Sequence, residues 1–159
     1  MRLALLTLVV SCLVGMPVFG QQTLPDPNLT PGVQNEEVTQ QTIASTICVR
    51  GYTKTIRPPA KYTSALKRRQ IREYGFEDTK LSDYEEDHLI SLELGGHPTD
   101  PGNLWPQSYL TQPWNAKAKD QLENFLNAEV CAGRIPLARA QREIASDWVA
   151  AYKKYLGEP

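Results

Sequence analysis

The sequence predicts an α+β domain in which a β-hairpin is followed by helices. Apolar residues alternate over 88–94 and a Gly-Gly pair closes the run, as in a half-buried strand that ends in a turn. Two later segments, 115–131 and 137–156, carry apolar residues at helical spacing. These helices are expected to cover the hairpin, with a short extended region before it.

The first 20 residues are expected to be an export signal rather than part of the fold. Arg2 gives a basic start, the following residues are apolar or small, and cleavage is expected after Gly20. A run of this length is too short to span a membrane. The alternative is a lipoprotein processed at Cys12. Either signal predicts an exported protein, periplasmic or secreted.

The segment after the signal, 21–35, contains three prolines and a glycine among polar residues and is expected to be a flexible leader. One domain is expected over 36–159, which is long enough for one modest core. Its first part, 39–56, is rich in Thr, Ile and Val. That composition favours short strands or an extended arm over a helix.

A helix is expected to start at Thr63 or Ser64, either of which can cap it, and to end near Tyr74. It lies in a segment, 50–72, that has eight basic residues and no acidic one, although the whole chain has a formal net charge of −1. This segment is either a solvated helix face or a surface that binds nucleic-acid phosphates. The expected phosphate contacts in this segment are Arg68, Arg69 and Arg72, and Lys119 of the later helix is expected to be a fourth.

Asp87 and His88 stand at the start of the alternating run, and a returning strand is expected over 103–107. A neutral imidazole can accept a proton near neutral pH, so His88 is the candidate general base. Asp87 and Asn115 offer the oxygen ligands that Mg²⁺ prefers. Asn103 is expected to bridge the two arms of the hairpin by hydrogen bonds and to fix the backbone around His88.

The order of Asp87, His88, a Gly-Gly turn, Asn103 and then Asn115 followed by lysines resembles the signature of HNH endonucleases. It covers about a quarter of the chain. The resemblance implies a ββα-metal core in which His88 activates water, Asp87 and Asn115 bind a divalent cation, and Asn103 supports the loop. The final ligand is Asn rather than the commoner His, and its spacing from Asn103 is longer than is usual in that family.

Two cysteines, Cys48 and Cys131, lie outside the expected signal. In an exported protein an even pair predicts a disulfide, here one that closes most of the domain. The alternative is Zn²⁺ held by both cysteines with His88 and His97, although the spacing is not that of a structural zinc site.

Together these observations predict an exported, Mg²⁺-dependent or otherwise metal-dependent nuclease that hydrolyses phosphodiester bonds in DNA or RNA. Its expected partner is nucleic acid, and no stable membrane span is expected. The alternative is a non-catalytic secreted binding module that keeps an HNH-like fold. In that protein Asp87 and His88 would only be hydrogen-bonded inside the domain, and no hydrolysis of plasmid DNA would be seen with Mg²⁺.

Overall fold

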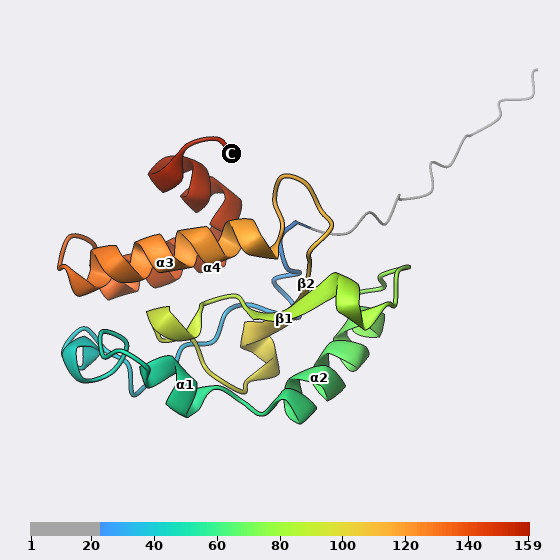
Figure 1. The fold of residues 1–159 in the computed structure, drawn as a ribbon, viewed down its shortest axis with the longest axis horizontal. Coiled ribbons are helices and arrows are strands. Elements are labelled where there is room, and N and C mark those ends of the chain that lie inside the picture. Colours follow the sequence, from blue (N-terminus) through green and yellow to red (C-terminus); the bar gives the residue numbers. More distant parts are fainter. Residues whose placement is uncertain (1–22) are drawn as a thin grey trace, which may run out of the picture.

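A computed structural model describes residues 23–159; the predicted export signal and the cysteine of the lipoprotein alternative lie outside them. A two-stranded antiparallel hairpin lies between two groups of helices, with α1 and α2 on one side and α3 and α4 on the other (Figure 1). This arrangement confirms the predicted α+β class. The elements are α1 (Tyr52–Ile56), α2 (Ala60–Glu73), β1 (Tyr84–His88), β2 (Leu104–Ser108), α3 (Ala116–Cys131) and α4 (Leu137–Leu156).

Strand β1 ends at His88, where the sequence pattern had predicted the strand to begin. The residues that follow form a loop with a 3₁₀ turn at Leu92–Leu94. The prediction was wrong because alternation requires one exposed face, whereas consecutive Leu89 and Ile90 are both fully buried. The pairing runs from Tyr84 opposite Ser108 to His88 opposite Leu104, so β2 starts one residue later than predicted.

The Gly-Gly pair closes this loop by a close approach of two backbone segments. Gly95 has a φ of +74°, in the left-handed region that favours glycine. A side chain at Gly96 would overlap the carbonyl of Ile90, which lies 1.7 Å from where a Cβ atom would stand. The pair is therefore a requirement of the loop that follows β1 and not a tight hairpin turn.

Residues 23–35 pack on the domain, which corrects the prediction of a flexible leader. The Gly32 N–H donates to the Gly102 carbonyl at 2.9 Å, and the His97 N–H donates to the Val33 carbonyl at 2.8 Å. An extended, proline-containing segment has free backbone groups, and here the loop that precedes β2 satisfies them. The segment therefore supports the loop that joins β1 to β2.

The segment 39–56 forms turns rather than the strands that its composition predicted. It contains a 3₁₀ turn at Ile43–Ser45 and helix α1. Its threonine side chains bond the local backbone: the Thr42 hydroxyl donates to the Glu37 carbonyl, and the Thr46 hydroxyl to the Thr42 carbonyl, both at 2.8 Å. Such bonds compete with the ladder of a sheet, and here they outweigh strand propensity.

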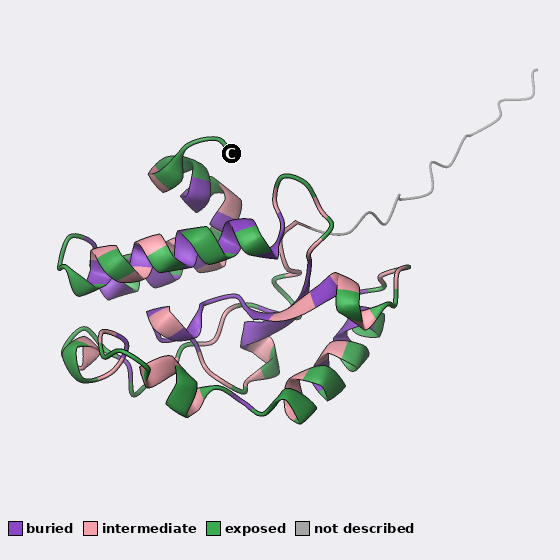
Figure 2. Cartoon of the chain, viewed as in Figure 1, coloured by how far each residue is buried: buried purple, intermediate pink, exposed green. Residues whose placement is uncertain are grey.

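Helices α3 and α4 pack against each other and enclose the main hydrophobic core. Figure 2 shows buried residues in stripes along α3. Helix α4 occupies the predicted range, but Asp147 departs from helical geometry with φ −163° and caps the last part by accepting a bond from the Ala150 N–H at 2.9 Å. No helix in the described part of the chain is long and apolar enough to cross a bilayer.

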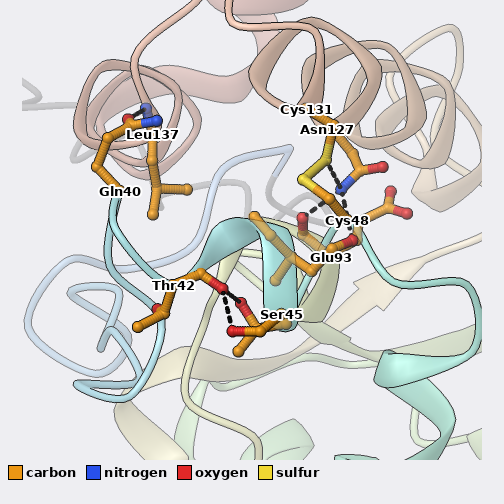
Figure 3. The surroundings of a disulfide bond; sticks show 10 residues. Gln40, Thr42, Ser45, Cys48, Glu93, Asn127, Cys131 and Leu137 are labelled. Carbon is orange, nitrogen blue, oxygen red and sulfur yellow. Dashed lines mark hydrogen bonds between the residues drawn. A yellow bond between two sulfur atoms is a disulfide. The ribbon is translucent and has the colours of Figure 1, made fainter.

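Cys48 and Cys131 form the predicted disulfide, with their Cα atoms 5.6 Å apart, and so are not zinc ligands. The bond joins the turns before α1 to the end of α3 (Figure 3). Beside it, the Asn127 amide donates to the Glu93 carbonyl at 2.7 Å, which ties α3 to the loop after β1. The disulfide fits the oxidising compartment that an export signal predicts.

We expect reduction of this disulfide to destabilise the domain. The two cysteines are 83 residues apart, and closing a loop of that length contributes about 4–5 kcal/mol in the chain-entropy description. The melting temperature should fall by about 10 °C or more on reduction. Calorimetry with and without reductant measures this shift, and thiol titration of the unreduced mature protein should find no free thiol. A shift of under about 2 °C would contradict the expectation.

Candidate active site

His88 stands at the end of β1 with its imidazole ring largely buried. Its Nε2 atom lies 2.9 Å from the carbonyl oxygen of Pro98, in the loop that joins the two strands. Because a carbonyl only accepts, Nε2 carries the hydrogen and Nδ1 of the neutral ring is left as a proton acceptor. Burial lowers the pKa of His88, so the ring is neutral at neutral pH.

His88 opens on a cleft of about 360 Å³ between β1 and the start of α2. Ala60, Thr63, Ser64 and Lys67 line one side, and they share one face of α2 because they are spaced three and four residues apart. The cleft thus combines an imidazole with two basic side chains, three hydroxyl groups and two carboxyl groups. These are His88, Arg57, Lys67, Thr63, Ser64, Tyr109, Glu85 and Glu86.

Asn103 braces the loop that holds His88, as the sequence predicted. Its side chain is fully buried. Its Oδ1 accepts from the Ile90 N–H at 3.0 Å, and its Nδ2 donates to the carbonyls of Ile90 and His97 at 3.0 and 3.1 Å. Ile90 and Asn103, at the two ends of the loop that carries the Pro98 carbonyl, are thereby joined to each other and to His97 within it. Asn103 acts on His88 through this loop and is not itself in the cleft.

Asp87 is directed away from the cleft, toward α3. Its Oδ2 lies 2.7 Å from the Nζ atom of Lys119 and 3.3 Å from the indole nitrogen of Trp105. Lys119 also contacts the Glu123 carboxylate and donates to the His88 carbonyl at 2.8 Å. The structure therefore places Asp87 and His88 on opposite sides of the strand, with Lys119 joined to both residues.

The ammonium group of Lys119 is completely inaccessible to solvent. It cannot reach a phosphate on the surface, which corrects the expectation that Lys119 contacts nucleic acid. Burial alone would lower its pKa, but the carboxylates of Asp87 and Glu123 outweigh burial and hold the pKa above its ordinary value. Lys119 therefore remains a cation inside the protein.

Asn115, the second predicted metal ligand, caps α3 by accepting from the Ala118 N–H at 3.1 Å. Asp87 is already paired with an ammonium group. Among residues 23–159 no three His, Cys, Asp or Glu side chains are grouped so that they could hold an ion. The arrangement of Asp87 and Asn115 therefore does not fit Mg²⁺.

Glu86 faces the same cleft as His88, because residues two apart in a strand share a face. Both of its carboxyl oxygens are buried and have no hydrogen-bond partner within the described chain. Burial raises the pKa of Glu86 to about 8, against the opposing effect of Lys67. Glu86 was not assigned to the site from the sequence. Its spacing from His88 was the signal that would have placed it in the cleft.

The raised pKa of Glu86 predicts that stability falls with rising pH. The unfolded chain releases this proton near the ordinary value of 4.5 and the folded protein near 8. The contribution of Glu86 to stability is therefore fully present below pH 4.5 and is lost up to about pH 8, by at most about 1.4 kcal/mol per pH unit. Glu86→Gln should flatten this part of the curve in urea denaturation at several pH values. The same slope in Glu86→Gln as in an exposed control, Glu77→Gln, would remove Glu86 as its cause.

Arg68, Arg69 and Arg72 are exposed on α2 and lie outside the cleft. The outer face of this helix is open to solvent in Figure 2. Arg69 pairs with Glu73 at 3.2 Å, across one helical turn. Sequence reasoning missed the two basic residues that do line the cleft, Arg57 and Lys67, because the approach of β1 to this part of the chain is a long-range contact.

No protein-family model, curated protein or solved structure matches this chain. The fold is a small α+β domain with an antiparallel hairpin followed by helices. The candidate active site is therefore assigned from the residues of this chain and their geometry alone. The arrangement supplies a proton acceptor, the His88 imidazole, and two cations that suit a phosphate group. It also supplies polar groups that could bond to a sugar or a nucleobase.

Proposed function

We propose that the protein is an exported nuclease that cleaves phosphodiester bonds in DNA or RNA at the cleft beside His88. The observation that carries the proposal is the neutral, buried imidazole whose orientation is fixed by the Pro98 carbonyl at 2.9 Å, at the edge of a cleft that also holds Arg57 and Lys67. The order of hairpin, asparagine-braced loop and helix supports the HNH-like interpretation.

In this reaction Nδ1 of His88 accepts a proton from the attacking water or, in RNA, from the 2′-hydroxyl group of the sugar. The attacking oxygen bonds to phosphorus as the bond between phosphorus and the leaving sugar oxygen breaks, and the leaving oxygen takes a proton from solvent. Arg57 and Lys67 lie on the same cleft and are the groups that would bind the phosphate oxygens. Pro98 and Asn103 hold the imidazole in one orientation, which removes part of the entropy cost of positioning the base.

The proposal is tested with the mature, disulfide-bonded protein, incubated with plasmid DNA and with a single-stranded RNA. Each substrate is offered with Mg²⁺ and with EDTA. Cleavage of either substrate that is lost in a His88 variant prepared in the same way supports the proposal. Cleavage that is equal in both preparations identifies a contaminant. No cleavage of either substrate contradicts the proposal and favours a non-catalytic binding module.

We expect the exposed arginines of α2 to bind substrate phosphates without taking part in the reaction. Changing Arg68, Arg69 and Arg72 to Gln should weaken binding to unrelated sequences about equally, because phosphate contacts carry no base information. The slope of log K against log salt should flatten by about one for each arginine that pairs with a phosphate in the parent. KM should rise while kcat stays within about twofold. Fluorescence anisotropy at several salt concentrations measures the slope.

The matched control changes three other exposed arginines to Gln, namely Arg134 before α4 and Arg139 and Arg142 on α4. Both triple variants remove the same charge, so a general electrostatic effect would appear equally in each. An equal change in both would show that net charge matters and the α2 surface does not. Parental binding and cleavage in the α2 variant would identify that surface as a solvated helix face.

A further inference from the structure

We propose that the ammonium group of Lys119 is a built-in cation that takes the place of a divalent metal ion at Asp87. The protein then binds no metal ion at Asp87, and its proposed hydrolytic reaction needs none there. The statement that activity needs no metal ion rests on the nuclease function proposed above. The part concerning metal binding is independent of that function and is tested separately.

Three oxygen atoms surround the Nζ atom of Lys119. They belong to Asp87 at 2.7 Å, to the carbonyl of His88 at 2.8 Å, and to the carboxylate of Glu123. An ammonium group has three N–H donors, so each donor has one acceptor. Carboxylate and carbonyl oxygens are also the ligands that a hard divalent cation takes. The lysine therefore uses the donor set that a metal would need.

The surroundings leave no place for a second cation. Lys119 and Trp105 are completely inaccessible to solvent, and Asp87 is nearly so. Mg²⁺ needs near-octahedral coordination and usually keeps several water molecules, which a closed environment of this kind does not admit. A divalent ion at Asp87 would also lie within a few ångströms of a buried ammonium group. Their repulsion would be little screened, because solvent is excluded.

Lys119 performs two tasks that a metal ion would perform. It neutralises the buried carboxylate of Asp87. It also ties the backbone of His88 to α3 through the His88 carbonyl, on the side of the strand opposite the cleft. The charge that meets a substrate phosphate comes from Arg57 and Lys67 in the cleft. Neither the position of the base nor the binding of phosphate then requires a bound metal.

The first test measures Mn²⁺ binding to the wild-type protein and to Asp87→Asn by electron paramagnetic resonance. Mn²⁺ is the probe because its bound and free forms are distinguished directly. We expect the two proteins to give the same titration, with only weak binding to surface carboxylates. Binding to the wild type that is at least tenfold tighter than binding to Asp87→Asn would overturn the proposal.

The second test removes the lysine. In Lys119→Ala the carboxylates of Asp87 and Glu123 and the His88 carbonyl lose their cation, and we expect Mn²⁺ binding to appear. Mn²⁺ should raise the melting temperature of this variant and leave that of the wild type unchanged. A folded Lys119→Ala that binds Mn²⁺ no better than the wild type would overturn the proposal. If the variant does not fold, the comparison of wild type with Asp87→Asn decides.

The third test compares cleavage in EDTA and in Mg²⁺. We expect rates within about threefold of each other, both lost in a His88 variant. A His88-dependent rate that falls at least tenfold in EDTA would overturn the proposal and leave the nuclease function standing. Absence of cleavage in both conditions would contradict the nuclease function alone, and the Mn²⁺ titrations would still decide the role of Lys119.

Discussion

Lys119→Met should lower the free energy of unfolding by about 3–5 kcal/mol, the cost of breaking a buried ion pair and leaving its partners without a counter-charge. The substitution removes the ammonium group and keeps an unbranched chain of similar length. It leaves Asp87 and Glu123 buried beside each other, and the His88 carbonyl without its donor. Urea denaturation measured by circular dichroism gives the free energy directly.

Lys117→Met is the matched control, because Lys117 is exposed on the same helix. It should change the free energy of unfolding by under about 0.5 kcal/mol. Adding Glu123→Gln to Lys119→Met should recover part of the stability, since one uncompensated carboxylate is then removed. A decrease of under about 1 kcal/mol in Lys119→Met would show that its ion pairs do not stabilise the domain, in conflict with the complete burial of the group.

The position of Lys119 could have been found in the sequence. It precedes Leu122 and Leu126 by three and seven residues, which places all three on one face of α3. Glu123 follows Lys119 by four residues, so the two side chains can pair. Lys119 was instead interpreted as a phosphate contact, because it lies near the lysine-rich start of the helix. What the sequence could not supply is the third partner, Asp87, because the contact of β1 with α3 depends on the tertiary fold.

The local features of the chain were predictable to different degrees. Helices α3 and α4 agreed with their predicted ranges to within a residue, because each has one apolar face and packs on the other. The disulfide followed from an even pair of cysteines in a chain that is predicted to be exported. The strand position was missed because a buried loop and a buried strand are both apolar. The packed segment 23–35 was missed because its backbone bonds to a distant loop leave no pattern in its own residues.

The same limit applies to the candidate active site. His88 and Asn103 were identified from residue type and spacing, and the bonds by which Asn103 braces the loop are those that were expected. The cleft itself was not predicted, because Arg57 and Lys67 meet β1 only in the folded chain. The two residues assigned to a metal were chosen for their oxygen atoms. Asn115 at a predicted helix start was already in the position of a cap, a signal that was not used. The pairing of Asp87 with a buried lysine depends on the tertiary fold and leaves no pattern in the sequence.

Replacing His88 should reduce cleavage by about 10²–10⁴-fold, the usual contribution of a general base. His88→Gln is the sharper variant, because its Nε2 amide group reaches about as far as the Nε2 of histidine and can still donate toward the Pro98 carbonyl, while its side chain cannot act as a base. His88→Ala also removes that bond and should cost about 1 kcal/mol of stability. Steady-state rates and melting curves of both variants separate loss of the base from loss of structure.

The pH dependence of the wild type identifies the same group. Burial lowers the pKa of His88 below its ordinary value of 6.5, so activity should hold at pH 6.5 and decline only in more acidic solution. Added imidazole should restore part of the rate in His88→Ala, where the missing ring leaves space beside the cleft. It should not change the rate of the parent. Activity within a few-fold of the parent in both variants would remove His88 as the base.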